Sequence, residues 1–125
     1  MRIMSHQNPM NPAAIERLCK LGGDAFTIRI IDMFINYCGE KVVNARQALV
    51  AGNMAAVADS AHPVKSSAGN VGAVRLQEFA ASLEEVARQG NRERVNDLLP
   101  KFEAAFAEAK IQLEDECAKL KSPSI

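Results

Sequence analysis

Apolar residues recur every three or four positions along most of this chain, which is the spacing of one face of an α-helix. The pattern predicts helices over about residues 12–21, 24–51, 54–69, 73–89 and 92–121. The breaks between them coincide with residues that end helices, namely Gly22-Gly23, Gly52-Asn53, the stretch 69–72 and Gly90-Asn91. No stretch alternates apolar and polar residues as a half-buried strand would. The pattern therefore predicts an all-α fold.

Four of these predicted helices are long and are joined by short connections. Short connections place consecutive helices side by side in opposite directions. We therefore expect an antiparallel up-down-up-down four-helix bundle over residues 11–121, with the short N-terminal helix as an additional element. Residues 1–10 are polar and lack periodicity, which predicts a flexible arm, and residues 122–125 are expected to form a frayed tail.

Two prolines lie inside predicted helices. Pro63 falls about ten residues into the third predicted helix, and Pro100 falls near the start of the last one. Proline lacks an amide donor and its ring clashes with the carbonyl four residues earlier. At Pro63 we expect either a bent helix or an altered function of the residues beside it, and we expect Pro100 to kink the last helix or to split off its first turn.

Composition excludes several classes of function. Fifteen basic and fifteen acidic residues among 125 leave no net charge, and no basic patch indicates nucleic-acid binding. No polybasic anchor, signal peptide or run of 18 apolar residues points to a membrane. Three scattered cysteines fit a reducing cytoplasm, and the apolar surroundings of Cys38 and Cys117 predict buried thiols.

The third predicted helix has two distinct faces. Opposite its apolar face lie Asp59, His62, Ser66 and Gly69, with Lys65 beside them. A neutral imidazole is a competent nucleophile near neutral pH, and a lysine three residues on can place a charge next to a transferred anion. A single histidine on a helix surface is more often an ordinary polar residue, so the pattern alone leaves both interpretations open.

Residues 61–73 read AHPVKSSAGNVGA. This stretch resembles the motif of histidine-containing phosphotransfer (HPt) domains, in which a histidine is followed by a lysine three residues on, by small residues, and by a glycine ten residues after the histidine. Weaker similarity extends from about residue 11 to residue 120. Ser66 stands where the family more often has glycine. The resemblance implies the same helical bundle that the periodicity predicts.

The resemblance also implies roles for individual residues. His62 would be the phosphorylated nucleophile, Lys65 would stabilise the phosphoryl group, and Glu84 would face the imidazole and orient it. The partner-docking surface would comprise Asp59, Pro63, Ser66, Gly69 and Asn70.

The function implied by the resemblance is that of a phosphorelay carrier. His62 would accept a phosphoryl group from the aspartate of a receiver domain, in a response regulator or a hybrid sensor kinase, and pass it to another receiver. The sequence contains no nucleotide-binding loop, so we expect no ATP-dependent kinase activity. We expect a cytoplasmic monomer with no cofactor of its own, because the receiver would supply the Mg²⁺.

Two alternatives belong to other classes. Pro63 motivates the first, a degenerate HPt-like bundle that acts as a protein-binding adaptor and is never phosphorylated. The second is a bundle that binds a ligand or a metal inside, which would require polar residues facing inward. The predicted stripes are apolar, and with only His6 and His62 available we expect no metal site.

Overall fold

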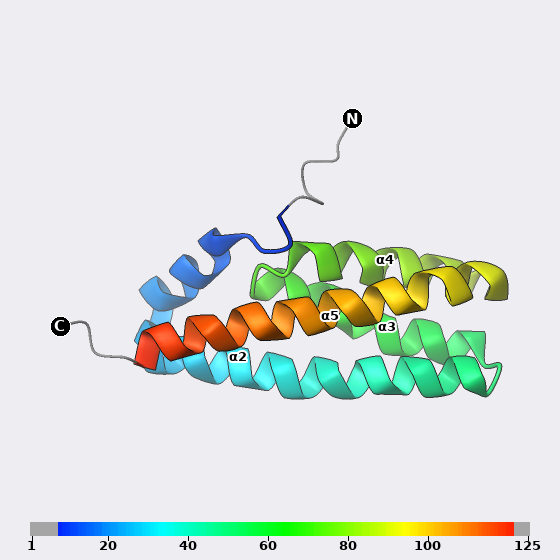
Figure 1. Cartoon of the computed structure of the whole chain (residues 1–125), viewed down its shortest axis with the longest axis horizontal. Helices are drawn as coiled ribbons and strands as arrows, with labels where there is room; N and C mark the ends of the chain where they lie inside the picture. Colours follow the sequence, from blue (N-terminus) through cyan, green and yellow to red (C-terminus); the bar gives the residue numbers. More distant parts are fainter. Residues whose placement is uncertain (1–7, 122–125) are drawn as a thin grey trace.

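The computed structural model describes residues 8–121, which form a bundle of four α-helices (Figure 1). In chain order the helices are α2 (Pro12–Val50), α3 (Met54–Asn70), α4 (Val74–Arg88) and α5 (Arg92–Lys121). The described residues contain no strand, which confirms the all-α prediction. Most of the predicted arm and the whole of the predicted tail, residues 1–7 and 122–125, lie outside the described residues.

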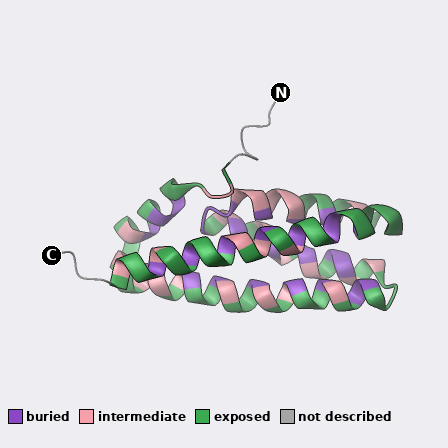
Figure 2. Cartoon of the chain, in the orientation of Figure 1, coloured by how far each residue is buried: buried purple, intermediate pink, exposed green. Residues whose placement is uncertain are grey.

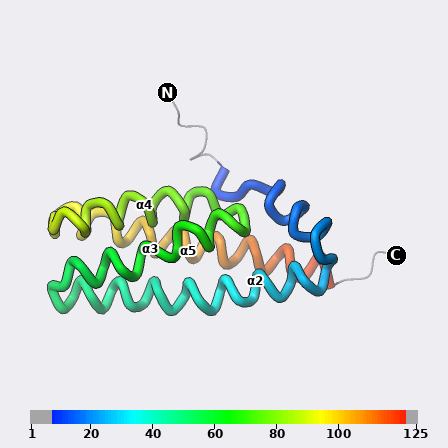
Figure 3. The backbone as a smooth tube through the Cα atoms, turned by 180° about the vertical axis from the view of Figure 1, so that it is seen from behind, coloured from blue at the N-terminus to red at the C-terminus, as the bar shows by residue number. Residues whose placement is uncertain are grey.

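The helices form an antiparallel ring, as predicted. Helix α2 packs on α3, α3 on α4, α4 on α5, and α5 closes the ring against α2. Figures 1 and 3 show the same up-down-up-down course from opposite sides. Two ion pairs tie α5 to its neighbours: Arg46 of α2 contacts Glu103 at 2.6 Å, and Arg75 of α4 contacts Glu108 at 3.0 Å.

Helix α2 contains both the short N-terminal helix and the first long helix of the prediction. Asn11 caps its start by accepting a hydrogen bond from the Ala13 amide, and Pro12 occupies the first helical position. At Gly23 the backbone leaves the helical region, with φ of 86°, and the helix folds back on itself (Figure 3). The buried Thr27 hydroxyl donates to the Gly23 carbonyl at 2.9 Å, which adds a hydrogen bond to the turn that follows the kink.

The core follows the predicted stripes closely. Buried positions lie on the sides of the helices that face one another (Figure 2). Small residues such as Ala58, Ala61 and Ala80 are fully buried beside the larger side chains, which lets the helices approach closely. The largest side chains that are almost completely buried are Phe102, Ile31, Leu76, Leu83, Leu99 and Leu113.

Gly72 lies where the connection between α3 and α4 meets the N-terminal segment. Its φ is +78°, and a Cβ at this position would collide with the carbonyl oxygen of Asn11 and lie 2.9 Å from the Ala14 Cβ. The Asn11 amide donates to the Gly72 carbonyl at 2.7 Å, and the Arg75 amide donates to the Pro9 carbonyl at 3.3 Å. The N-terminal segment is thereby attached to the end of α3.

Pro100 does not split off the first turn of α5, so that one of the two expectations for it is wrong, and Pro63 does not interrupt α3. A kink at Pro100 stays a prediction. Both helices continue through their prolines. The carbonyl that loses its donor belongs to Asn96 in α5 and to Asp59 in α3, and both residues are exposed, so water can bind these oxygens. A solvent-facing carbonyl makes a helix-interior proline tolerable without a break.

Candidate functional site

His62 projects from the outer face of α3. The side chain is 62% exposed, whereas Val57, Ala61 and Val64 on the opposite face are fully buried. The helix is fixed at its start by Asn53, whose side chain accepts a hydrogen bond from the Ala56 amide. Burial of one face therefore determines that the imidazole faces outward.

Glu84 of α4 lies against the imidazole, as the sequence analysis expects. Its Oε2 is 2.8 Å from His62 Nδ1, and its Oε1 is 2.7 Å from Lys65 Nζ. The Glu84 side chain is only 13% exposed, so this carboxylate is held between α3 and α4. The structure thus brings together the three residues predicted to carry the chemistry.

The charge state of Glu84 determines which nitrogen of the His62 ring carries the hydrogen. Burial raises the pKa of Glu84, but the hydrogen bonds and charges of Lys65 and His62 lower this pKa by more, so it lies below its ordinary value. The carboxylate is therefore ionised at neutral pH and only accepts hydrogen bonds. A neutral His62 ring must then carry its hydrogen on Nδ1, which leaves the Nε2 lone pair free for nucleophilic attack.

Arg88 also belongs to this cluster and was missed by the sequence analysis. Its Nη1 lies 2.9 Å from Asp59 Oδ1, and its Nη2 lies 3.5 Å from Glu84 Oε2. The pKa of Arg88 is raised, chiefly by its hydrogen bond to Asp59. The spacing of four residues between Glu84 and Arg88 on one helix was the signal that could have revealed it.

The remaining residues of the predicted docking surface lie on the same outer face of α3. Ser66 and Asn70 are exposed, and Pro63 is half-buried. A Cβ at Gly69 would come within 2.6 Å of Gln77 Nε2. Gly69 thus makes room for a side chain of α4.

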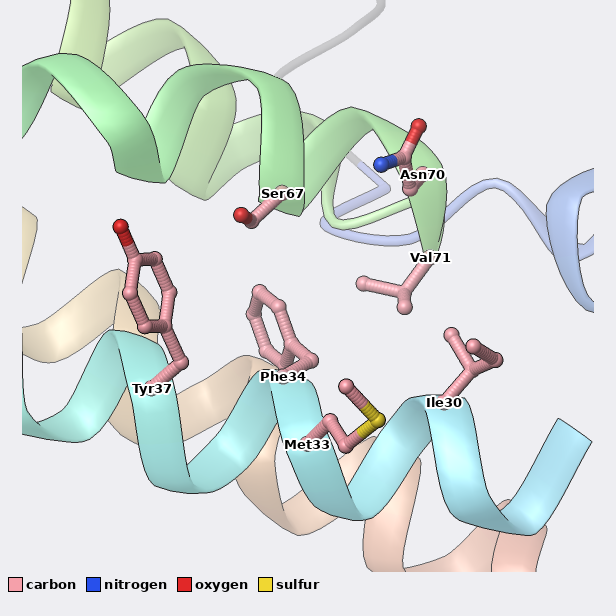
Figure 4. Close-up of a pocket in the computed structure, with 7 residues that line it drawn as sticks. All are labelled: Ile30, Met33, Phe34, Tyr37, Ser67, Asn70 and Val71. Atoms are coloured by element: carbon pink, nitrogen blue, oxygen red, sulfur yellow. The ribbon is translucent and has the colours of Figure 1, made fainter.

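An apolar groove of about 250 Å³ lies between α2 and α3 (Figure 4). Ser67 and Asn70 of α3 line it, and they lie about one and a half and two turns along the helix from His62. Figure 4 shows the aromatic rings of Phe34 and Tyr37 rising from α2 toward Ser67. Met33 and Tyr37 are exposed although they are large and apolar. Sequence reasoning missed the groove, because only the distance between the two helices creates it.

Within residues 8–121, no cluster of three or more histidine, cysteine, aspartate or glutamate side chains has an arrangement that could hold a metal ion. No helix within that range is long and apolar enough to cross a membrane.

The sequence matches the family model described as "Hpt domain" over residues 29–122, which is most of the chain. The chain belongs to the Hpt family. A solved structure, histidine-containing phosphotransfer protein B (HptB) from Pseudomonas aeruginosa PAO1, superimposes with a TM-score of 0.83 at 27% identity. The alignment covers 89% of this chain and 96% of HptB. No curated protein matches the sequence.

Membership of the Hpt family determines the general role of this chain. It is a phosphotransfer carrier of two-component signalling, and proteins of this family act as carriers rather than as kinases. Receiver domains are the partners of such carriers in general.

Proposed function

We propose that this Hpt protein accepts a phosphoryl group on His62 Nε2 from a receiver-domain aspartate and passes it to a second receiver. The observation that carries the proposal is the hydrogen bond between His62 Nδ1 and the ionised Glu84, at 2.8 Å, beneath a ring that is otherwise exposed. This contact orients the ring and directs the nucleophilic nitrogen toward solvent, where a partner can approach.

The transfer would proceed in line. Nε2 attacks phosphorus, the P–O bond of the aspartyl phosphate breaks, and the receiver's carboxylate leaves. The phosphorylated ring still carries the Nδ1 hydrogen and gains positive charge, which the Glu84 carboxylate stabilises. Lys65 would neutralise charge on the phosphoryl oxygens. The receiver would bring its own Mg²⁺, and onward transfer would reverse the same steps.

The receiver would dock over the outer face of α3, and its contact would extend along Ser66 and Asn70 into the groove between α2 and α3. Support comes from the continuity of these surfaces, because Asn70 belongs to both. Exposed Met33 and Tyr37 offer the apolar area that a docked partner buries. We further propose that the carrier acts as a monomer in the cytoplasm, where its exposed docking face meets receivers.

The test is to incubate the chain with phosphorylated receiver domains and to follow acid-labile phosphate on it. We expect labelling of the wild type and of His6→Gln, which removes the other histidine, and no labelling of His62→Gln. Receivers that bind the wild type without labelling it would instead support the adaptor alternative. That alternative is suggested by Pro63, which lies beside the nucleophile.

A further inference from the structure

Four charged side chains surround His62 and cancel one another. Asp59 and Lys65 lie on α3, and Glu84 and Arg88 lie on α4. Lys65 contacts Glu84 at 2.7 Å, while Arg88 contacts Asp59 at 2.9 Å and lies 3.5 Å from Glu84. Each cation therefore has a primary anionic partner in this state, and Glu84 has a second cation close by.

Phosphorylation of His62 would disturb this balance. A phosphoryl group adds about two negative charges next to the ring. The Lys65 ammonium, which binds Glu84 in the unphosphorylated protein, would then have to interact with the phosphoryl oxygens and with the carboxylate at the same time. Glu84 would stay in place, because it binds His62 Nδ1 and the phosphorylated ring would keep that hydrogen. The carboxylate therefore needs another cation when Lys65 turns toward the phosphoryl group.

We propose that Arg88 is a positioning residue that closes on Glu84 when Lys65 turns to the phosphoryl group on His62, and that it gives up Asp59 to do so. This inference rests on the proposed function and extends it to a residue on the second helix of the site. Arg88 acts on the phosphoryl group only through Glu84 and Lys65.

The geometry around Arg88 suits this exchange. Its Nη2 already lies 3.5 Å from Glu84 Oε2, the oxygen that binds the imidazole. The guanidinium has five N–H donors, so it can bind first one carboxylate and then the other. Its present bond to Asp59 joins side chains that are 47% and 71% exposed, and pairs so exposed are weak and easily exchanged. In the present arrangement Lys65 and His62 counter the effect of burial on the Glu84 pKa.

A purely structural role for Arg88 makes a different prediction. The pair between Arg88 and Asp59 links α3 to α4, and if this link were all that mattered, removal of either partner would have the same effect. In the exchange that we propose, Asp59 competes with Glu84 for the guanidinium. Removal of Asp59 should then favour the exchange, whereas removal of Arg88 should prevent it.

The first experiment mimics the departure of Lys65 without any phosphorylation. In Lys65→Gln, the Glu84 pKa is measured from its ¹³C carboxyl chemical shift and compared with that in Lys65→Gln/Arg88→Gln and Lys65→Gln/Asp59→Asn. We expect Arg88→Gln to raise the Glu84 pKa by about one unit, a tenfold change in proton affinity, and Asp59→Asn to lower it. A Glu84 pKa that is the same with and without Arg88 overturns the proposal, as does a rise with Asp59→Asn.

The second experiment measures the exchange during phosphorylation, with phosphoramidate as a small donor that needs no receiver. Its P–N bond breaks, ammonia leaves, and a new P–N bond forms at His62 Nε2. We expect Arg88→Gln to slow this reaction roughly tenfold, by the same free energy as one pKa unit, and Asp59→Asn to accelerate it. Equal slowing by both substitutions would show a merely structural link and overturn the proposal.

Controls separate folding and the proposed function from the exchange. Arg94→Gln removes an exposed arginine from α5, a helix that carries none of the four charges around His62, and should match the wild type in phosphorylation rate. Thermal unfolding of each variant shows whether it folds. A wild type that takes no phosphate on His62 would refute the proposed function, and the titration without phosphate would still decide whether Arg88 closes on Glu84.

Discussion

Gly72 offers a sharp test of how the N-terminal segment is held on the bundle. The substitution is Gly72→Ala, and two features of the structure oppose the added methyl group. The backbone has φ of +78°, and the Cβ would meet the carbonyl oxygen of Asn11 and lie 2.9 Å from the Ala14 Cβ. The obstacle from Asn11 is backbone, so no side-chain rotation relieves it.

The magnitude follows from these two features. An L-residue in the left-handed region costs about 1–2 kcal/mol. Relief of the contact requires the segment at Asn11 to move, which breaks its 2.7 Å hydrogen bond to the Gly72 carbonyl at a cost of about 1 kcal/mol. Partial exposure of Ile15 adds about 1 kcal/mol. Alanine also lowers the conformational entropy of the unfolded chain, which stabilises the folded state by about 0.5 kcal/mol and offsets part of this cost. We expect a decrease of about 3 kcal/mol in the free energy of unfolding.

Urea unfolding followed by circular dichroism measures this decrease, and Gly90→Ala is the matched control. Gly90 has φ of +71° but no atom within 4 Å of the position of its Cβ, so this variant should lose only about 1 kcal/mol for backbone strain. Hydrogen exchange of the amides of residues 11–15 should accelerate in Gly72→Ala alone. Equal losses of stability in the two variants would refute the assigned role of the N-terminal contact.

Three further predictions concern the site and the thiols. The pKa of Glu84 is lower in the folded than in the unfolded state, so the ionised carboxylate stabilises the fold at a pH above its unfolded-state pKa. This stability is lost as the pH falls through the folded-state pKa. The loss of stability caused by Glu84→Gln, measured by urea unfolding, should therefore be present at pH 7 and shrink below about pH 4. Pro63→Ala restores an amide donor for the Asp59 carbonyl and should raise the free energy of unfolding by about 1 kcal/mol, measured in the same way. Cys38 is fully buried and burial raises its pKa to about 11, so a thiol reagent at pH 8 should modify half-buried Cys19 first and Cys38 only on unfolding.

Each of these has an outcome that contradicts it. A Glu84→Gln effect that is equally large at pH 3 would mean that ionisation of the carboxylate adds no stability. A loss of stability in Pro63→Ala would show that the ring contributes packing that exceeds the restored hydrogen bond. Modification of all three cysteines at one rate in the folded protein would contradict the burial of Cys38.

Local physics explains why so much of the fold could be predicted. Helix periodicity and the glycine breaks depend on neighbours within a few residues, and both appear in the structure. The placement of Lys65 beside His62 follows from helix geometry alone. Glu84 was reached through the resemblance to the HPt motif, because no local rule joins residues 22 positions apart.

Only the tertiary structure decided the features that depend on how the helices approach one another. Arg88 meets Asp59 across 29 positions, and the groove beside Tyr37 is lined by residues from two separate helices, α2 and α3. The positive φ of Gly72 is compatible with many turns, but the contact with Asn11 requires the folded end of the bundle. The sequence by itself determined the helices and the outward-facing His62. The packing of α4 against α3 determined the charges around that histidine, because those contacts form only when distant segments meet.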